Sequence, residues 1–563
     1  MNGAPARILA FIKWHWEPVL SAFDASSALS AISPVPAPLP TVREAVLDLL
    51  RSWGIQHVFG NPGSTELPLF IDFPADFHYV LGLQESVVVA MADGFAQATR
   101  NASFVNLHSA AGVGHAMGNI FTAFKNRTPL VITAGQQARS ILPFDPFLHS
   151  AQATELPKPY VKWSVEPARA QDVPLALARA YYVAMQPPRG PVLVSIPADD
   201  WAVPCAPVAA RQVSTELRPQ PSLLAQLGDA LDACQRPALV IGAAIDRDGA
   251  WDAAVALAER HQARVWVAPM SGRCGFPEDH PLFAGFLPAM RERINQRLAG
   301  HDLILALGAP AFTYHVEGQG PHVPAGAALC QVTDDPQTAA WAPVGLSVVA
   351  SLRLALLDLL DRPPPPRRRP PALRAAPPRA EAPAGDERLS VAYVLQTLSE
   401  MRPVDSIVVE EAPSARAVMH QYLPITRSET FYTMCSGGLG WSMPAAVGVA
   451  MAKPGQRVIA LIGDGSAMYA IQALWSAAQQ GLNISFLILK NRRYAALQEF
   501  ATSFGFAAGV ALPGCDLPDL DFLALAAGQG CPSLRVRSTE ELVAHLQQAL
   551  ACDGPMLVEI DVA

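Results

Sequence analysis

The stretch Val458-Ile459-Ala460-Leu461-Ile462-Gly463-Asp464-Gly465-Ser466 decides the fold of the C-terminal part of the chain. A second apolar run, residues 484–489, ends in Lys490-Asn491-Arg492-Arg493-Tyr494. Short apolar runs of this kind indicate buried parallel strands, and we expect residues 467–480 between them to form the crossover helix. The two polar clusters then lie at the carboxyl ends of adjacent strands, where open α/β sheets bind ligands.

These clusters carry groups that suit a metal-bound diphosphate. Gly465 allows the backbone to come close to a diphosphate, and the amides after it begin a helix. The Asp464 carboxylate and the Asn491 amide oxygen are hard ligands of the kind that Mg²⁺ prefers. The sequence therefore predicts a magnesium and diphosphate site at this edge of the sheet.

Composition excludes several classes of protein. A length of 563 residues exceeds a single core and predicts about three domains. The net charge of −8 argues against a nucleic-acid partner, which would need a basic face. Eight scattered cysteines without a CxxC pair favour a reduced, cytoplasmic setting. Lys13 interrupts the apolar residues 8–12, so they cannot span a membrane. We expect residues 1–40 to be a disordered extension or a misassigned start.

Alternating strand and helix patterns divide the rest of the chain. They predict three doubly wound α/β domains with parallel sheets, at residues 41–203, 222–361 and 389–563. Thr41 is the expected N-cap of the first helix, and Ser222 that of the helix that opens the second domain. Residues 204–221 form a polar linker. Residues 362–388 are rich in proline and predict an extended tether with a solvated arginine triplet, residues 367–369.

The Gly463-Asp464-Gly465 sequence with the later Asn491 resembles the signature of thiamine diphosphate-dependent enzymes. The resemblance covers residues 41–563 and implies pyrimidine-binding, middle and diphosphate-binding domains in that order. It implies thiamine diphosphate as cofactor, with Mg²⁺, for which Ca²⁺ can substitute, held by Asp464, Asn491 and the Arg493 carbonyl. It also implies these cofactor-binding residues: Glu85, Ser414, Gly437, Leu439, Gly463, Gly465, Ser466 and Tyr494.

Two of these residues have chemical tasks in the cofactor's activation. Glu85, in Leu83-Gln84-Glu85, follows a strand pattern and opens a helix. By resemblance it is the acid that drives the aminopyrimidine into its imino form. Leu439, in Ser436-Gly437-Gly438-Leu439-Gly440, is the bulky residue that folds the cofactor, and Gly437 offers a carbonyl to the pyrimidine.

Residues 59–68, 106–112 and 308–315 resemble one branch of this family, the benzoylformate decarboxylases. The resemblance implies that Ser64 binds the substrate carboxylate, His108 relays protons and His315 protonates the enamine. The implied reaction is the non-oxidative decarboxylation of an aryl 2-oxo acid, benzoylformate to benzaldehyde and CO₂, through attack by the C2 ylid. The residues implied at the aryl end of the substrate are Phe147, Leu148, Ala496, Leu497 and Phe500.

Several positions depart from that branch and leave alternatives open. Residues 410–414 stand where a Ser/Thr-rich run is usual. Thr433 and Met434 replace an aromatic residue and a cysteine. Met468 replaces an asparagine, and Arg492-Arg493 replaces Gly-Thr. One alternative is a decarboxylase for another bulky 2-oxo acid. A second is a carboligase, which either resembles acetolactate synthase or forms 2-hydroxyketones. A third alternative is a catalytically silent thiamine-fold binding subunit. The resemblance also implies a homodimer or homotetramer with shared active sites.

Overall fold

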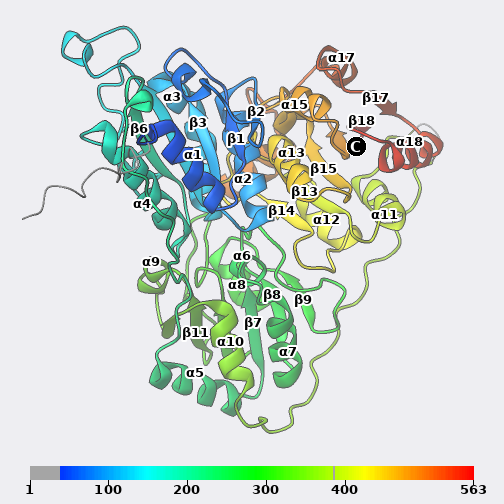
Figure 1. Cartoon of the computed structure of the whole chain (residues 1–563). Coiled ribbons are helices and arrows are strands. Elements are labelled where there is room, and N and C mark those ends of the chain that lie inside the picture. Colours follow the sequence, from blue (N-terminus) through cyan, green and yellow to red (C-terminus); the bar gives the residue numbers. More distant parts are fainter. Residues whose placement is uncertain (1–37, 385–386) are drawn as a thin grey trace, which may run out of the picture. The chain divides into compact units, whose positions relative to one another are not determined.

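Three six-stranded sheets, each with every strand parallel to its neighbours, organise the residues described in this computed structural model, 38–384 and 387–563 (Figure 1). The expectation for residues 1–40 falls almost entirely outside these ranges. Alternating helices connect the strands, so the predicted α/β class with three parallel sheets is confirmed. No helix in the described ranges is long and apolar enough to cross a membrane.

The first sheet has the order β2-β1-β3-β4-β6-β5. Its helix α1 begins as predicted, because the Thr41 side chain accepts from the Glu44 amide and Glu44 caps Thr41 in return. The strands are β1 (His57–Gly60), β2 (His78–Leu81), β3 (Ser103–Leu107), β4 (Leu130–Gln136), β5 (Ser164–Val165) and β6 (Val192–Pro197), and the helices are α1 (Val42–Ser52), α2 (Glu85–Thr99), α3 (Ser109–Asn126) and α4 (Val173–Met185).

The middle sheet has the order β12-β11-β10-β7-β8-β9. Its first helix begins at Pro221 with Gln220 before it, so the prediction of Ser222 as N-cap is wrong by two residues. The strands are β7 (Pro237–Ile241), β8 (Arg264–Val267), β9 (Phe283–Phe286), β10 (Leu303–Leu307), β11 (Ala328–Thr333) and β12 (Leu346–Val349), and the helices are α5 (Pro221–Ala233), α6 (Ala243–Arg247), α7 (Trp251–His261), α8 (Arg291–Arg297), α9 (Pro336–Ala340) and α10 (Leu352–Leu360).

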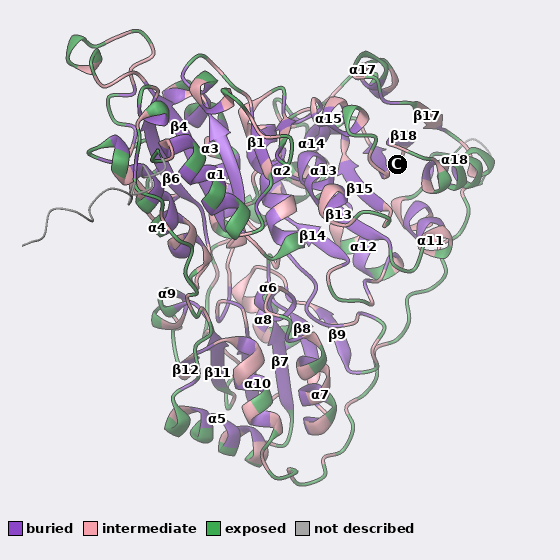
Figure 2. Cartoon of the chain, viewed as in Figure 1, coloured by how far each residue is buried: buried purple, intermediate pink, exposed green. Residues whose placement is uncertain are grey.

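The third sheet, β14-β13-β15-β16-β18-β17, repeats the strand order of the first. Figure 2 shows its central strands buried, as their apolar runs require. The strands are β13 (Ile407–Glu411), β14 (Phe431–Thr433), β15 (Val458–Gly463), β16 (Ile484–Lys490), β17 (Ser533–Val536) and β18 (Met556–Asp561), and the helices are α11 (Val391–Met401), α12 (Arg416–Tyr422), α13 (Ser442–Ala452), α14 (Asp464–Ala467), α15 (Ala473–Gln479), α16 (Ala495–Ala501), α17 (Phe522–Gly528) and α18 (Thr539–Ala551).

The connection between β15 and β16 differs from the prediction. Instead of one helix over residues 467–480, the chain forms the single turn α14 and, after a break at residues 468–472, the helix α15. The short α14 begins at Asp464 itself, with Gly463 as its N-cap. The correction matters because it places the whole Gly-Asp-Gly turn at a helix start, where backbone amides point outward.

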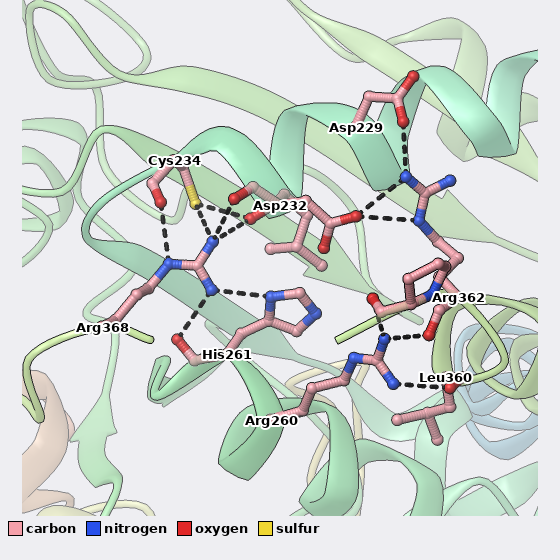
Figure 3. Close-up of polar contacts among 10 residues, drawn as sticks. Asp229, Asp232, Cys234, Arg260, His261, Leu360, Arg362 and Arg368 are labelled. Atoms are coloured by element: carbon pink, nitrogen blue, oxygen red, sulfur yellow. Dashed lines mark hydrogen bonds and ion pairs between the residues drawn. The ribbon is translucent and has the colours of Figure 1, made fainter. Parts of the chain in front are cut away.

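Two arginines, Arg362 and Arg368, anchor the start of the proline-rich linker to the middle domain (Figure 3). The Arg368 guanidinium donates to the carbonyl oxygens of Asp232 and Cys234 and, at 2.9 Å, to Nδ1 of His261. Burial, and then the charge of Arg368, lower the pKa of His261 to about 4, so the ring is neutral and can accept this bond. Arg362 pairs with Asp229 and Asp232. The prediction of a solvated triplet is therefore wrong for Arg368, although its two neighbours are exposed.

Helices α2 and α13 bring the first and third domains together. They pack at backbone distance, because a Cβ on Gly94 would overlap the Ala445 carbonyl and a Cβ on Gly448 would overlap the Met91 carbonyl. Both glycines lie within their helices, where glycine otherwise costs stability. The close approach therefore explains why glycine occupies these two positions.

Replacing Gly448 by alanine should destabilise the protein by about 1–3 kcal/mol, since the added methyl must push α13 away from α2. The matched control is Gly528→Ala at the end of α17, where nothing lies within 4 Å of the new Cβ. Thermal and denaturant unfolding of both variants provide the measurement. Equal midpoints for the two variants would contradict the packing argument.

Candidate active site

A cavity of about 520 Å³ lies at the carboxyl ends of the third-domain strands β13, β15 and β16. This edge is the place where a doubly wound sheet leaves a crevice between crossover connections. His315 joins the lining from the middle domain. The predicted residues that line the cavity are Ser414, Gly437, Leu439, Gly463, Asp464, Gly465, Ser466, Asn491, Arg493, Tyr494, Ala496, Leu497, Phe500 and His315.

The turn after β15 presents oxygen ligands at the wall of this cavity. The Asp464 carboxylate is buried, and it accepts the Gly465 amide at 2.8 Å and the Arg492 amide at 2.6 Å. Burial raises the pKa of Asp464 above its usual value. The Asn491 side-chain oxygen accepts the Arg493 amide at 3.1 Å. A carboxylate and an amide oxygen at neighbouring strand ends fit a divalent cation such as Mg²⁺.

The same turn carries groups that suit a diphosphate. A Cβ on Gly465 would overlap the Tyr494 ring, so only glycine lets the backbone lie beneath that ring. Ser466 follows in the first turn of α14, and its hydroxyl and the amides around it belong to a helix start, which attracts anions. The residues present therefore fit a magnesium-bound diphosphate.

Glu410 and Glu411, which depart from the expected Ser/Thr-rich run, point away from the cavity into the protein. The Glu411 carboxylate accepts the amides of Gly440, Trp441 and Ser442 at 2.6–2.9 Å, and so caps the start of α13. Burial raises the pKa of Glu411 to about 7, although the three amide donors oppose the shift. Glu411 therefore supports the loop that carries Gly437 and Leu439, and neither glutamate lines the cavity.

That loop lines the cavity with a glycine and an apolar side chain. Gly437 has φ of +74°, a conformation that favours glycine, and nothing lies within 4 Å of the Cβ it lacks. Leu439 is partly buried and packs against the core shared by α2 and α13. The loop thus presents backbone polar groups and one bulky side chain to the cavity.

His315 and the apolar wall meet at the edge of the cavity. The His315 ring stacks on Phe500, with 4.4 Å between ring centroids and 25° between planes. The His315 amide donates to the Ala289 carbonyl, which fixes the loop after β10. Leu497 is exposed in the single chain, although it lines the cavity. A middle-domain imidazole is thus held against the predicted aryl-binding wall.

His108 belongs to a second group of residues, in the first domain. It follows β3, and its Nδ1 lies 2.9 Å from a carboxylate oxygen of the buried Glu66 and 3.0 Å from the Thr65 hydroxyl. Glu66 also accepts the Gly63 amide. A carboxylate on Nδ1 leaves Nε2 available for proton transfer. Ser64 is exposed beside this pair. The sequence analysis did not identify Glu66 as a partner of His108. The only sign of this role in the sequence is that Glu66 lies two residues after Ser64.

Glu85 is the first residue of α2, and its side chain is largely buried. One of its carboxylate oxygens lies 3.1 Å from Nδ1 of His115 on α3. The sequence offered no sign of this partner, because His115 is in a different helix. Glu85, Ser64 and His108 are all absent from the lining of the third-domain cavity.

Phe147 and Leu148 lie in an irregular loop of the first domain. Phe147 is 86 % exposed, and Leu148 adopts a positive φ of +66°. The Gln137 side chain and the Ser109 hydroxyl donate to the carbonyls of Phe147 and Leu148, which ties the loop to the end of β4 and the start of α3. The predicted pocket residues are therefore divided: Ala496, Leu497 and Phe500 line the cavity, and these two do not.

Three family models match the chain in this order: "Thiamine pyrophosphate enzyme, N-terminal TPP binding domain" at residues 40–156, the central domain at 224–359 and the C-terminal TPP binding domain at 413–560. The chain belongs to the thiamine pyrophosphate enzyme family. It is 46% identical over 526 residues to a benzoylformate decarboxylase of Pseudomonas aeruginosa, covering 93% of this chain and 99% of the relative. It is 26% identical to an acetolactate synthase of Arthrospira platensis, over 92% of this chain and 93% of that one.

Solved structures agree with this assignment. The crystal structure of benzoylformate decarboxylase from Polynucleobacter necessarius matches with a TM-score of 0.90 and 41% identity, covering 93% of this chain and 99% of that one. A thiamine diphosphate-dependent 4-hydroxybenzoylformate decarboxylase of Rhodococcus jostii matches with a TM-score of 0.89, 42% identity and the same coverage. The three-domain fold and the thiamine diphosphate dependence predicted from the sequence are confirmed.

Asp464→Ala should raise the concentration of thiamine diphosphate and Mg²⁺ needed for half-saturation at least about tenfold, because it removes one of the two side chains expected to bind the metal. Quenching of tryptophan fluorescence on cofactor titration measures binding without relying on turnover. Asp553→Ala, at an exposed position of the same domain, is the control. An unchanged affinity in Asp464→Ala would mean that the metal binds elsewhere.

Proposed function

We propose that this protein decarboxylates aryl 2-oxo acids without oxidation, converting benzoylformate to benzaldehyde and CO₂. The observation that carries the proposal is one continuous cavity in which the Asp464–Asn491 edge, the His315 imidazole and the apolar side chains of Leu497 and Phe500 meet. An aryl group needs such an apolar wall. The 46% identity to a benzoylformate decarboxylase over 93% of the chain supports the same reaction.

The third domain would hold the cofactor at its diphosphate end. Asp464, Asn491 and the Arg493 carbonyl would bind Mg²⁺, while the backbone around Gly465 and Ser466 contacts the phosphates. Bound thiamine diphosphate supplies a nucleophilic ring carbon and accepts the electron pair released as CO₂ leaves. Leu439 would support the bent cofactor, and Gly437 and Glu85 would bind the two edges of its pyrimidine.

The remaining polar residues act on the substrate. Ser64 would donate to the substrate carboxylate, and His108, oriented by Glu66 through Nδ1, would exchange a proton at Nε2 with the oxygen of the reacting carbonyl. His315, held by its stack on Phe500, would deliver the proton that replaces CO₂. Imidazole suits both transfers because its usual pKa lies near neutral pH.

A complete site of this kind requires two copies of the chain. Within one chain, Ser64, Glu85 and His108 do not line the cavity that holds the diphosphate residues. The loop that carries the exposed Phe147 is tied by the Ser109 hydroxyl to the start of α3, next to His108 in the sequence. A homodimer, alone or within a homotetramer, would bring the first domain of one copy to the cavity of the other and cover Phe147.

The substrate preference follows from the apolar wall. Benzoylformate should exceed pyruvate in kcat/KM at least about a hundredfold. Burying apolar surface stabilises a complex by roughly 25 cal/mol per Å², and the phenyl ring of benzoylformate buries much more of it than the methyl group of pyruvate. Release of CO₂ at saturating cofactor measures both substrates. Leu497→Ala, which removes part of the wall, should narrow the ratio, whereas Val543→Ala, on an exposed face of α18, should leave it unchanged. A preference for pyruvate would overturn the proposed substrate, and no CO₂ from either would favour a silent binding subunit.

A further inference from the structure

A second chamber, of about 750 Å³, adjoins the cofactor cavity. It lies between the carboxyl ends of β8 and β9 in the middle domain and helix α12 in the third. The two cavities share five lining residues, namely Met270, His315, Pro413, Arg416 and Phe500. The stacked His315–Phe500 pair that borders the aryl end of the first cavity is therefore also a wall of the second.

The chamber combines apolar walls with positive charge. Trp266, Phe286, Leu287 and Pro288 supply apolar surface. Three arginines, Arg297, Arg374 and Arg416, also line it, and its described lining includes no aspartate or glutamate. An apolar chamber with cationic side chains and no lining carboxylate suits a ligand that has an apolar body and an anionic end.

The three arginines are not equivalent. Arg416 is paired at 2.8 Å with the buried Glu410 and donates to Thr433, so its charge is largely balanced. Arg374, from the proline-rich linker, has its guanidinium carbon 5.5 Å from the centre of the Phe283 ring, an arrangement that leaves the charge available to an anion. Arg297 ends α8 and is exposed. Arg374 and Arg297 therefore supply the unbalanced positive charge of the chamber.

The size of residue 433 affects the space inside the second chamber. Thr433 lines the second chamber, at the position where the related decarboxylases were expected to carry an aromatic residue. Its hydroxyl donates to the Glu410 carbonyl and lies 3.0 Å from the Glu410 carboxylate. The smaller side chain, drawn toward Glu410, leaves space that an aromatic ring would occupy.

We propose that this chamber extends the substrate pocket and selects aryl 2-oxo acids whose ring carries a side arm that ends in a carboxylate. The inference rests on the proposed decarboxylation and specifies its substrate class. The 2-oxo acid end would occupy the cofactor cavity, the ring would contact Phe500, and the distal carboxylate would meet Arg374 and Arg297. Their unbalanced charge should attract the anion more than a neutral arm of equal length.

The test compares three substrates on the cofactor-loaded enzyme, namely benzoylformate, 4-(2-carboxyethyl)benzoylformate and the uncharged 4-propylbenzoylformate. We expect the carboxylate substrate to exceed the propyl substrate in kcat/KM at least about tenfold at low ionic strength, with the ratio falling as salt rises. Arg374→Gln should reduce that ratio at least about fivefold, and Arg369→Gln, an exposed arginine of the same linker, should not change it.

A second pair of variants tests the space that Thr433 leaves in the chamber. Thr433→Phe should lower the kcat/KM of the carboxylate substrate at least about tenfold, whereas Thr433→Val should keep most of it. The contradicting result is a wild-type enzyme that decarboxylates benzoylformate but has a kcat/KM for the propyl substrate that equals or exceeds that for the carboxylate substrate. This result would overturn the role of the chamber and leave the proposed reaction unaffected. Failure to decarboxylate all three substrates would overturn the proposed function and this inference with it.

Discussion

The buried carboxylate of Asp93 holds the catalytic framework together. Its two oxygens accept hydrogen bonds from Gln97 and Thr128 on one side and from Asn126 and the Trp441 indole on the other, at 2.6–3.0 Å. Burial raises the pKa of Asp93, and the four donors offset the cost of burying it. Because Asp93 lies on α2 and Trp441 precedes α13, this one side chain fixes the helix of Glu85 relative to the loop of Leu439. The glycine-mediated contact of α2 with α13 depends on the same alignment.

The repeated strand order of the first and third sheets explains how the site residues are distributed. In both sheets the polar side chains follow the two strands that flank the topological switch point, where the strand order reverses. In the first sheet, Ser64 follows β1 and His108 follows β3. In the third sheet, Ser414 follows β13 and Asp464 follows β15. In the proposed site, the first and third domains would therefore each contribute one half, from the carboxyl edge of its own sheet. The middle domain adds His315 and the second chamber. Under the proposed shared site, activity would depend on the assembly of two copies, and the middle domain would contribute to the choice of substrate.

Local sequence determines much of this architecture. The apolar runs before Gly463 and Lys490 specify strands, and the Thr41 capping box specifies a helix start, because these signals act within a few residues. Contacts between distant segments were not predictable in the same way. The Glu85–His115 and Glu66–His108 pairs, the inward direction of Glu411 and the anchoring of Arg368 all depend on tertiary packing. The break in the predicted crossover helix has no glycine or proline to mark it.

Complementation between two inactive chains tests the central claim, that one active site is shared by two copies, most directly. Glu85→Gln removes the acid from the first-domain half, and Asp464→Ala removes the metal ligand from the third-domain half. Randomly paired dimers of the two variants should recover about a quarter of wild-type activity, since half of the dimers are mixed and one of their two sites is intact. Verified mixed dimers with no recovered activity would show that both halves of the site act within one chain.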